Sequence, residues 1–402
     1  MQGRDAGGKQ DRTVRQVNGA SIGARHGVPL REKPGGAQQA APLRRARIEV
    51  GLLGATGAVG QHFVRLLAGH PWFRLTWLAA SERSSGRRYG DLPWRLPVAL
   101  ADEIAALPVH APGAGNAPEL VFSALDASVA GECEAELAAR GHWVVSNARS
   151  HRMDPCVPLL VPEVNPGHLA LVERQEEERG WRGALVTNPN CSTVFLSMAL
   201  AALRPFSPRR VMVTTLQALS GAGYPGVASV DAAANVIPYI EGEEEKLERE
   251  TQKILGSVDA GSVEPHPVAI SAQATRVPVL DGHTEAVSVE FAQPVGREEM
   301  RAAFAEFRGE PQALALPNAP AKPIVLHERE DRPQPRIDVE AYGGMAVHVG
   351  RLRPCPVLGW KFVLLGHNMV RGAAGGALLN AELLVARGMV ASAGNFRAGL
   401  TA

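Results

Sequence analysis

A glycine-rich segment between a strand-like run and a helix-like run constrains the fold of this chain most strongly. Residues 48–53 form a short apolar run suited to a buried strand, Gly54-Ala55-Thr56-Gly57-Ala58-Val59-Gly60 follows, and residues 61–68 suit a helix. A strand, a glycine-rich turn and a helix in this order direct backbone N–H groups at a pyrophosphate, which predicts a dinucleotide site. The glycine spacing differs from the commoner G-x-G-x-x-G. A tight strand–helix turn without a ligand is therefore the competing interpretation.

The remaining pattern predicts two domains of different kinds. Between residues 47 and 190, predicted strands alternate with helices, as in a doubly wound α/β domain. These strands are expected at 48–53, 75–80, 119–123 and 143–146. Residues 191–367 read as an α+β catalytic domain, with a helix at 192–203, a strand at 211–218 and further strands within 276–292. The Pro-rich segment 294–340 is expected to be less regular, and 168–180 and 368–386 are expected to be helices.

The loop after the second expected strand bears on the choice between NAD and NADP. An NAD site usually has an acidic residue there, which binds the ribose hydroxyls. This chain has Ser81-Glu82-Arg83-Ser84-Ser85-Gly86-Arg87-Arg88, and serine and arginine side chains suit a 2′-phosphate, so NADP is favoured. Glu82 leaves a ribose contact open, and a solvated basic loop is the alternative without a ligand.

One thiol lies at a turn before a helix-like run. It belongs to Thr187-Asn188-Pro189-Asn190-Cys191-Ser192-Thr193. Unpaired N–H groups and partial positive charge at a helix N-terminus favour a thiolate, which predicts that Cys191 is an activated nucleophile. Ser192 or Thr193 is expected to cap the helix. The alternative is a small buried hydrophobic side chain beside an Asn-Pro turn.

A histidine follows a turn signal later in the chain. Asp281-Gly282 separates two strand-like runs, and His283 begins the second of them. A histidine is a natural base for a cysteine nucleophile, because its pKa lies near working pH. A partly buried strand histidine is the alternative, since the chain has 12 histidines and spacing alone does not select this one.

Composition argues against several classes of function. The 402-residue chain has a net charge of +1, which does not mark it for nucleic acid, and no apolar run of about 18 residues for a membrane span. Its cysteines, 133, 156, 191 and 355, show no metal-ligand spacing, so no metal is expected, and they suit a reducing cytoplasm. Residues 1–46 lack apolar periodicity and are predicted to be a disordered N-terminal extension, with a transit peptide as the alternative.

Short sequence blocks spread over most of residues 47–390 carry a family resemblance. They are GATGAVGQ at 54–61, SNARSHRMD at 146–154, VPLLVPEVNP at 157–166, TNPNCST at 187–193, QALSGAGYPG at 217–226, NVIPYIEGEEEK at 235–246, RVPVLDGHTEAV at 276–287 and HNMVRGAAGGALLNAE at 367–382. In this order they resemble the aspartate-semialdehyde dehydrogenase family, in the branch found in archaea, fungi and some bacteria. Their number and order make the resemblance specific.

The resemblance implies a role for each matched residue. Cys191 would form a covalent thioester, His283 would be the acid/base, and Gln217 would help to place the substrate. The substrate-binding residues would be Arg276 for the carboxylate, Glu243 for the amino group, Lys246 and Arg152 for phosphate, and Asn190. The cofactor-binding residues would be Gly54, Thr56, Gly57, Ala58, Val59, Ser81, Arg83, Ser84, Ser123, Ser192, Gly221 and Asn368. From the residues alone, Glu243 to Lys246 suit an exposed charged helix, because residues 241–250 are rich in both signs.

The activity implied by the resemblance is reversible, NADP-dependent reductive dephosphorylation of L-4-aspartyl phosphate to L-aspartate 4-semialdehyde. That reaction serves the biosynthesis of lysine, threonine, methionine and isoleucine. The partners would be the substrate and inorganic phosphate, the catalytic domain would form a homodimer or homotetramer, and segment 368–402 would join the NADP-binding domain. The alternatives are a malonyl-CoA reductase or another thioester or acyl-phosphate reductase, and a non-catalytic binding protein. Glu243 discriminates between the aspartate-semialdehyde and malonyl-CoA activities, because a malonyl group has no amino group to pair with a carboxylate. The neighbouring Glu244 and Glu245 blur which glutamate matches the family position.

Overall fold

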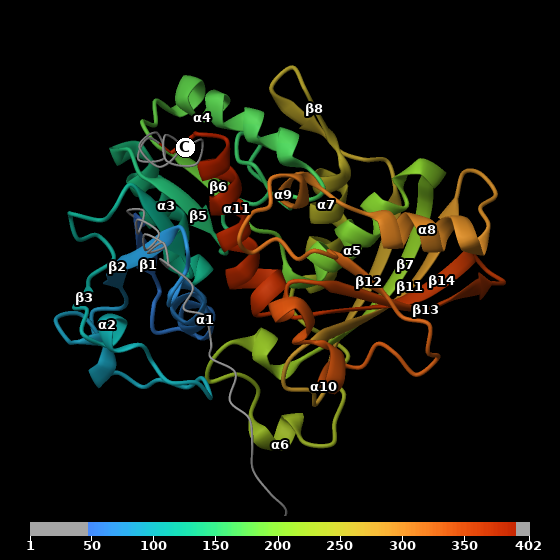
Figure 1. Ribbon diagram of the computed structural model, residues 1–402, viewed down its shortest axis with the longest axis horizontal. Coiled ribbons are helices and arrows are strands. Elements are labelled where there is room, and N and C mark those ends of the chain that lie inside the picture. The colour runs from blue at the N-terminus through green and yellow to red at the C-terminus, as the bar shows by residue number, and fades with distance from the viewer. Residues whose placement is uncertain (1–46, 391–402) are drawn as a thin grey trace, which may run out of the picture. The chain divides into compact units, whose positions relative to one another are not determined.

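The structure, a computed structural model, describes residues 47–390 (Figure 1). The predicted disordered extension 1–46 lies outside the described residues, as does the last part of segment 368–402. Two six-stranded sheets carry most of the described helices. The domain boundaries expected at residues 47, 190 and 367 remain predictions. None of the described helices has the length and apolar character needed to cross a lipid bilayer.

The first sheet is parallel throughout, in the strand order β3-β2-β1-β4-β5-β6. Its strands are β1 (Ile48–Leu53), β2 (Phe73–Ala79), β3 (Val109–His110), β4 (Leu120–Ser123), β5 (Trp143–Ser146) and β6 (Ala184–Thr187). Its helices are α1 (Ala58–Leu67), α2 (Asp102–Ala105), α3 (Ala127–Arg140) and α4 (Leu171–Arg179). The strand order reverses between β1 and β4, where doubly wound sheets bind ligands beyond the carboxyl ends of the strands. The predicted doubly wound α/β fold is confirmed.

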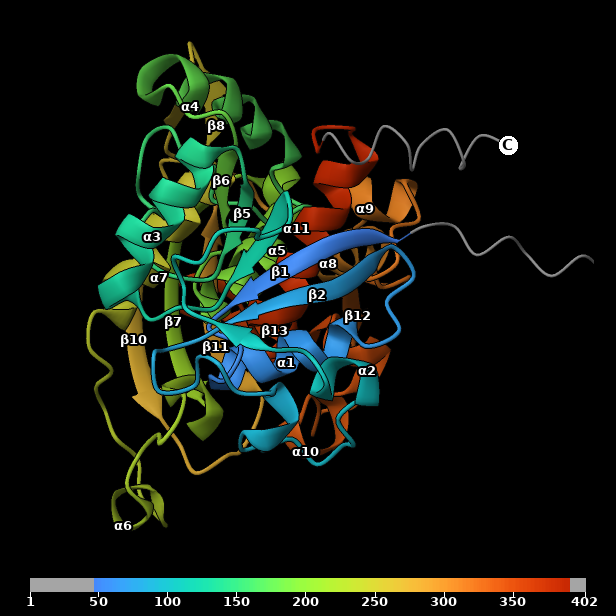
Figure 2. The ribbon, with the colours of Figure 1, turned by 90° about the vertical axis from the view of Figure 1, so that its left-hand side faces the viewer.

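Strand β1 is buried on both of its faces. Val50 and Leu52 belong to one apolar core, which includes side chains of α1, whereas Leu53 belongs to a second core with Trp77 and Val121. Figure 2 shows β1 and β2 side by side within this sheet. A strand covered on both faces needs a nearly continuous apolar run, which explains why the sequence pattern alone located it.

The second sheet is mixed, in the strand order β10-β7-β11-β14-β13-β12. Its strands are β7 (Pro208–Gln217), β10 (Ala269–Arg276), β11 (His283–Phe291), β12 (Ile324–Leu326), β13 (Val347–Cys355) and β14 (Gly359–Gly366). The helices α5 (Cys191–Ala202), α7 (Glu243–Leu255) and α8 (Arg297–Glu306) cover one face. Shorter elements are α6 (Ser229–Ala232), α9 (Glu310–Ala313), α10 (Pro335–Asp338) and the hairpin β8 (Ser257–Asp259) and β9 (Ser262–Glu264). The expected α+β architecture is confirmed.

One expectation about this part of the chain is wrong. Helix α8 lies inside the Pro-rich segment 294–340, which was expected to be less regular. Met300 and Phe304, one turn apart, are both fully buried against the second sheet. An apolar pair at this spacing stabilises a helix by packing even where the surrounding composition suggests a loop.

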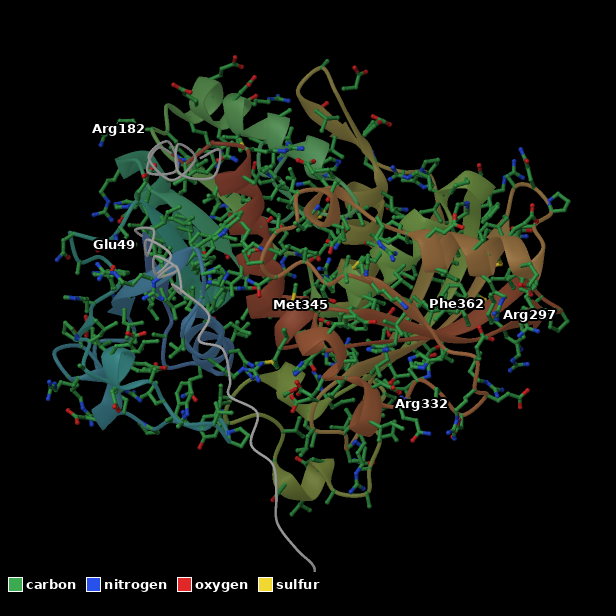
Figure 3. The ribbon with its side chains drawn as sticks, in the orientation of Figure 1. Glu49, Arg182, Arg297, Arg332, Met345 and Phe362 are labelled. Atoms are coloured by element: carbon green, nitrogen blue, oxygen red, sulfur yellow. The ribbon has the colours of Figure 1, made fainter. Side chains whose placement is uncertain are left out.

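The C-terminal helix returns to the first sheet. A π-helical turn, Val370–Ala374, leads into α11 (Gly375–Ala386), and both pack in the core that contains β1. Met345, labelled in Figure 3, belongs to that same core although β13 of the second sheet begins two residues later. Phe362, also labelled there, belongs to the core of the second sheet. The two sheets are therefore joined through side chains from the last third of the chain.

Candidate active site

Neighbouring strands of the second sheet bring three predicted site residues together. Arg276, the last residue of β10, pairs with Gln217, the last residue of β7. Thr284 of β11 pairs with Leu216 of β7, so His283 lies beside Gln217 at the next position. Arg276, Gln217 and His283 are all buried. The strand register thus places a guanidinium, an amide and an imidazole in one row.

The loop 277–282 differs from the sequence-based expectation. The sequence predicted strand-like runs on both sides of Asp281-Gly282, but β10 ends at Arg276. Residues 277–279 stay hydrogen-bonded to the end of β7 and the segment after it, since Val277 N donates to Gln217 O and Leu219 N donates to Val279 O. This part of the loop therefore follows the chain beyond β7 without forming a regular strand.

The predicted nucleophile is the first residue of α5. Asn190 is the N-cap, and its Oδ1 accepts hydrogen bonds from Ser192 N at 3.0 Å and from Thr193 N at 3.3 Å. The expectation that Ser192 or Thr193 caps the helix is wrong, because the helix begins earlier, at Cys191. Both residues lie in the first turn and donate their N–H groups to the cap.

Glu243 begins α7, and its carboxylate is buried among other predicted site residues. Its Oε1 accepts hydrogen bonds from Asn190 Nδ2 and, at 3.1 Å, from Gln217 Nε2, while its Oε2 lies 3.2 Å from Lys246 Nζ. Burial acts to raise the pKa of Glu243, but Lys246, Asn190 and Gln217 together hold it below its usual range. The carboxylate is therefore ionised, and the exposed charged helix is the wrong interpretation for this residue.

The next glutamates on α7 face other surroundings, which resolves the register that the sequence left blurred. Glu244 accepts a hydrogen bond from Ala274 N of the edge strand β10 at 2.9 Å, and Glu245 is exposed. Glu243 and Glu250 are both buried, and seven residues separate them, so they lie on one face of the helix.

Glu250 is a site residue that the sequence analysis missed. Its Oε1 lies 3.0 Å from Arg152 Nη1, and its Oε2 accepts a hydrogen bond from Asn190 N at 2.6 Å. Arg152 also donates to Asn147 O at 2.7 Å. These contacts hold Arg152 beside the nucleophile turn. The signal in the sequence was the spacing of Glu243, Leu247 and Glu250 along one helix face.

The electrostatics of the thiol differ from the sequence-based expectation. Burial, with a further contribution from Glu243, raises the pKa of Cys191 to about 12. Arg152, the N–H of Ser192 and Arg276 act in the opposite direction but do not offset burial. Desolvation therefore favours the neutral thiol over the predicted thiolate, although Cys191 is half-buried and keeps some exposed surface. The role of Cys191 as the nucleophile stays a prediction. Arg152 and Arg276 are the charges that stabilise a thiolate once it has formed.

The backbone holds the ring of His283 in one tautomer. Its Nδ1 accepts a hydrogen bond from Ala218 N at 3.0 Å, so the neutral ring carries its proton on Nε2. Burial, with contributions from Arg276 and His367, lowers the pKa of His283 to about 3. Within residues 47–390, the buried Nε2 has no hydrogen-bond partner. His283 therefore presents an N–H donor to the site, rather than the base for the thiol that the sequence predicted.

Two predicted cofactor residues lie against the same strand ends. A Cβ on Gly221 would come within 2.7 Å of Arg276 Nη1 and 2.9 Å of His283 Cε1, so a side chain there would displace one of these two groups. Asn368 is buried, and its Oδ1 accepts a hydrogen bond from Gly282 N at 2.9 Å. Both residues therefore position the row that contains Arg276 and His283.

The glycine-rich turn follows the carboxyl end of β1 and fits a bound pyrophosphate. Gly57 is the N-cap of α1 and is exposed, and having no side chain it leaves the helix N-terminus open to an anion. Gly54 has a φ of +74°, and a Cβ there would lie 2.4 Å from Ala124 O. A Cβ on Gly60 would lie 2.2 Å from Gly54 O. The residues between these glycines, 55–59, therefore form a close turn that a larger residue at either end would disrupt.

The other predicted cofactor residues differ in exposure. Ser81 and Arg83 are exposed in the loop after β2, and Ser84 is half-buried. Ser123, the last residue of β4, is fully buried, and its hydroxyl lies beside the Glu134 carboxyl. The loop can contact a ligand through its side chains, whereas the hydroxyl of Ser123 faces the interior. Ser192 is likewise fully buried.

Comparison with known proteins agrees with this arrangement. The NAD binding domain of semialdehyde dehydrogenases matches residues 49–172, and the dimerisation domain of semialdehyde dehydrogenases matches residues 200–371. The aspartate-semialdehyde dehydrogenase of Archaeoglobus fulgidus is 49% identical over 343 residues, which are 84% of this chain and 98% of that protein. The chain belongs to the aspartate-semialdehyde dehydrogenase family.

Two further relatives show the range of this family. The crystal structure of aspartate-semialdehyde dehydrogenase with NADP from Candida albicans matches with a TM-score of 0.80 and 40% identity, covering 85% of this chain and 100% of that chain. The malonyl-CoA reductase (NADP) of Metallosphaera sedula is 38% identical over 354 residues, which are 86% of this chain and 99% of that protein. The resemblance to the aspartate-semialdehyde dehydrogenase family is confirmed.

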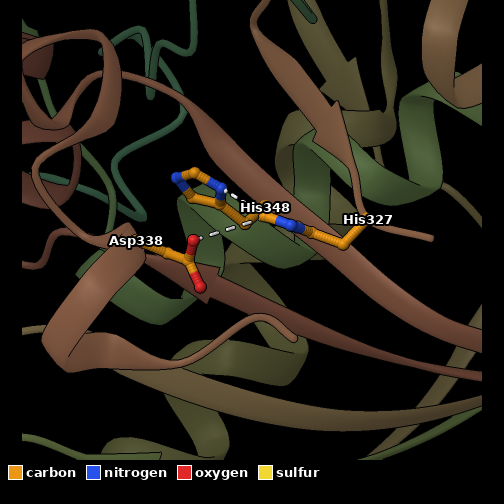
Figure 4. A group of neighbouring side chains, drawn as sticks. All are labelled: His327, Asp338 and His348. Atoms are coloured by element: carbon orange, nitrogen blue, oxygen red, sulfur yellow. Dashed lines mark hydrogen bonds and ion pairs between the residues drawn. The ribbon is translucent and has the colours of Figure 1, made fainter. Parts of the chain in front are cut away.

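Among the described residues, one group of potential metal ligands lies close together: His327, Asp338 and His348 (Figure 4). Their ligand atoms lie within 4.8 Å of one another, and His327 Nε2 lies 2.9 Å from His348 Nδ1. The Asp338 carboxylate, however, is paired with the Arg332 guanidinium and also accepts a hydrogen bond from Gln334 N at 2.6 Å. Because Arg332 already supplies the cation, we assign this group to a hydrogen-bond network and propose no metal there.

This network predicts a loss of stability in acid. Burial, with contributions from His327 and Arg332, lowers the pKa of His348 from 6.5 to about 4. The unfolded chain therefore binds a proton that the folded chain does not, so the stability is full above pH 6.5 and falls between 6.5 and 4. Between about pH 7 and about pH 5, protonation of this histidine in the unfolded chain is expected to lower the free energy of unfolding by about 2 kcal/mol.

Urea unfolding of wild type and His348→Gln at both pH values measures this effect. The variant is expected to lose about 2 kcal/mol less than wild type on acidification, because it lacks the titrating ring. His151→Gln, a half-buried histidine outside the network, is the control and should behave as wild type. An equal acid loss in wild type and His348→Gln would contradict the prediction.

Proposed function

We propose that this protein catalyses the reversible, NADP-dependent reductive dephosphorylation of L-4-aspartyl phosphate to L-aspartate 4-semialdehyde, through a thioester on Cys191. One observation carries the proposal: a buried guanidinium, Arg276, and a buried ionised carboxylate, Glu243, both lie near the Cys191 thiol. Arg276 lowers the pKa of the thiol and Glu243 raises it. An α-amino acid needs one group for its carboxylate and one for its ammonium, and a guanidinium binds a carboxylate through two N–H groups. The product serves the biosynthesis of lysine, threonine, methionine and isoleucine.

The first half-reaction is acyl transfer to sulfur. The Cys191 sulfur attacks the acyl carbon, the C–S bond forms, and the bond to the phosphate oxygen breaks, so that the thiol proton leaves with inorganic phosphate. Arg152, held by Glu250, and Lys246, held by Glu243, are the cations proposed to bind that phosphate. Splitting the reaction at a covalent intermediate replaces one difficult step with two easier ones.

The second half-reaction reduces the thioester. When bound, NADPH supplies a hydride to the thioester carbon. The glycine-rich turn 54–60 and the loop residues Ser81, Arg83 and Ser84 are proposed to bind it. The Nε2–H of His283 donates a hydrogen bond to the oxyanion that develops on the thioester oxygen. The oxyanion collapses to the aldehyde, the C–S bond breaks and the thiolate is returned, so a donor at His283 is sufficient.

The activity is tested with the full-length protein in the oxidative direction. NADPH formation from NADP is expected to require aspartate semialdehyde and inorganic phosphate together. Malonyl-CoA with NADPH is the second arm, and little consumption of NADPH is expected there. If malonyl-CoA is reduced and aspartate semialdehyde is not oxidised, the proposed substrate is wrong and malonyl-CoA is the substrate instead.

Glu243→Gln tests recognition of the substrate amino group. The variant is expected to raise the KM for aspartate semialdehyde by about tenfold or more, because a charge-assisted hydrogen bond is worth roughly 1.5–3 kcal/mol. Glu245→Gln is the matched control, since Glu245 lies on the same helix turn but is exposed. Steady-state kinetics with both variants decides the matter, and an unchanged KM in Glu243→Gln would sink the assignment.

Arg83→Asp tests the choice of cofactor. Placing a carboxylate where the 2′-phosphate is expected should raise the KM for NADP by about tenfold and leave the KM for NAD little changed. Arg87→Asp is the control, because the Arg87 guanidinium donates instead to Asp91 O at 2.6 Å. If both cofactors respond equally to Arg83→Asp, the 2′-phosphate binds elsewhere.

The chain has a dimerisation domain, and we propose that it forms a homodimer or homotetramer through the second sheet. The face of this sheet opposite α5 exposes Met212, at 54%, and the adjoining turn exposes Val357, at 75%. Apolar side chains exposed on a sheet face are typical of an interface. Analytical ultracentrifugation measures the oligomer size.

All four cysteines are unpaired, which supports the proposed cytoplasmic location.

A further inference from the structure

A buried glutamate lies one row below the predicted catalytic residues, and the proposed chemistry does not use it. Glu285 follows His283 by two residues on β11, so both side chains point to the face covered by α5. Its cross-strand neighbours are Thr215 on β7 and Leu364 on β14. The side chain is fully buried, with 0% of the residue exposed.

The carboxyl of Glu285 faces the hydroxyl of Ser192, the residue directly after Cys191 on α5. Among residues 47–390, neither carboxyl oxygen nor the Ser192 hydroxyl has a hydrogen-bond partner at standard geometry, so each is the available partner of the other. The N–H groups of Ser192 and Thr193 already bond to Asn190 Oδ1. The backbone N–H groups of this helix terminus are therefore taken, and the Ser192 hydroxyl is what remains to bond the carboxyl.

The charges around Glu285 decide its protonation. On this face β7 carries Val213, Thr215 and Gln217, and β14 carries Phe362, Leu364 and Gly366, none of which ionises. Cys191 on α5 and His283 on β11 are the titratable neighbours, and both are neutral at neutral pH. Burial raises the pKa of Glu285 well above its usual value, with Ser192 acting in the opposite direction. A buried carboxylate without a cation is costly, whereas the protonated acid has an O–H to donate.

We propose that Glu285 is a positioning residue for the nucleophile, which as a neutral carboxylic acid hydrogen-bonds Ser192 Oγ and so fixes the turn that carries Cys191. This inference rests on the proposed role of Cys191. Neutrality is essential, because a negative charge behind the turn would oppose both the thiolate and the developing oxyanion in a poorly screened interior. Ionisation of Glu285 in alkaline solution therefore reduces turnover.

Two substitutions separate this role from a charged one. Glu285→Gln keeps a neutral side chain that donates and accepts, so kcat is expected to stay within about threefold of wild type, without the alkaline decline caused by Glu285. Glu285→Met removes the hydrogen bond and is expected to lower kcat by about tenfold or more, with the KM for NADP unchanged. Glu290→Gln, at the exposed end of the same strand, is the control.

Two measurements need no substrate and so test the inference separately from the proposed reaction. An infrared difference spectrum of wild type against Glu285→Gln is expected to show the band of a protonated carboxyl in wild type. Iodoacetamide labelling of the Cys191 peptide, followed by mass spectrometry against pH, is expected to be as fast in Glu285→Gln as in wild type and slower in Glu285→Met. A missing carboxyl band, a loss of more than about a hundredfold in Glu285→Gln, or full activity in Glu285→Met would each overturn the proposal.

Discussion

Replacement of Cys191 by alanine is expected to reduce turnover by roughly four orders of magnitude or more, since it removes the atom that carries the acyl group. Alanine fits the site, because Cys191 has its Cβ packed near Gly372 and the substitution adds no atom there. The fold and NADP binding are therefore expected to survive. Rates with aspartate semialdehyde, together with NADP binding by fluorescence, measure the two effects separately.

Cys133→Ala is the matched control for this experiment. Cys133 lies on α3 of the first sheet and is half-buried, so its loss removes a thiol from a different part of the chain. Its turnover is expected to equal that of wild type. More than about a tenth of wild-type turnover in Cys191→Ala would exclude the thioester mechanism.

His283→Asn is expected to lower kcat by roughly two to three orders of magnitude with a smaller change in KM. The reason is that the Nε2–H acts on charge that appears in the transition state, and one such donor is worth about 10²–10³ in rate. Asparagine is shorter, so its amide does not reach the position of Nε2. Steady-state kinetics in the oxidative direction separates kcat from KM.

The pH dependence gives a second check on His283. Because its pKa is lowered to about 3, the ring stays neutral through the working range. Titration of His283 is therefore expected to leave no transition near pH 6.5 in the wild-type profile of kcat against pH. The profiles of wild type and His283→Asn are expected to have the same shape in this range. Such a transition would show that His283 titrates during turnover, and the acid/base role expected from the family would then replace the donor role.

The parts of this fold that were predictable are those specified by local patterns. The run 48–53 is apolar except for Glu49 because β1 is buried on both faces, and Gly60 is required by its contact with the Gly54 carbonyl six residues earlier. The α7 register was not predictable in this way. Glu244 accepts a hydrogen bond from the edge strand β10, and Glu245 is exposed to solvent. Only the packing of the helix decides which glutamate is buried.

The sequence by itself determined the residue types of the site, the strand–turn–helix unit and the family. Cys191, Arg276 and His283 were found from a turn, a helix start and a resemblance, all of which are properties of short segments. The tertiary structure decided their electrostatics. The pKa of Cys191 rises and that of His283 falls because both side chains are desolvated, and the tautomer of His283 depends on Ala218 N, 65 residues earlier. Burial and hydrogen bonds between distant residues arise only when the strands pair, so no local pattern in the chain encodes them.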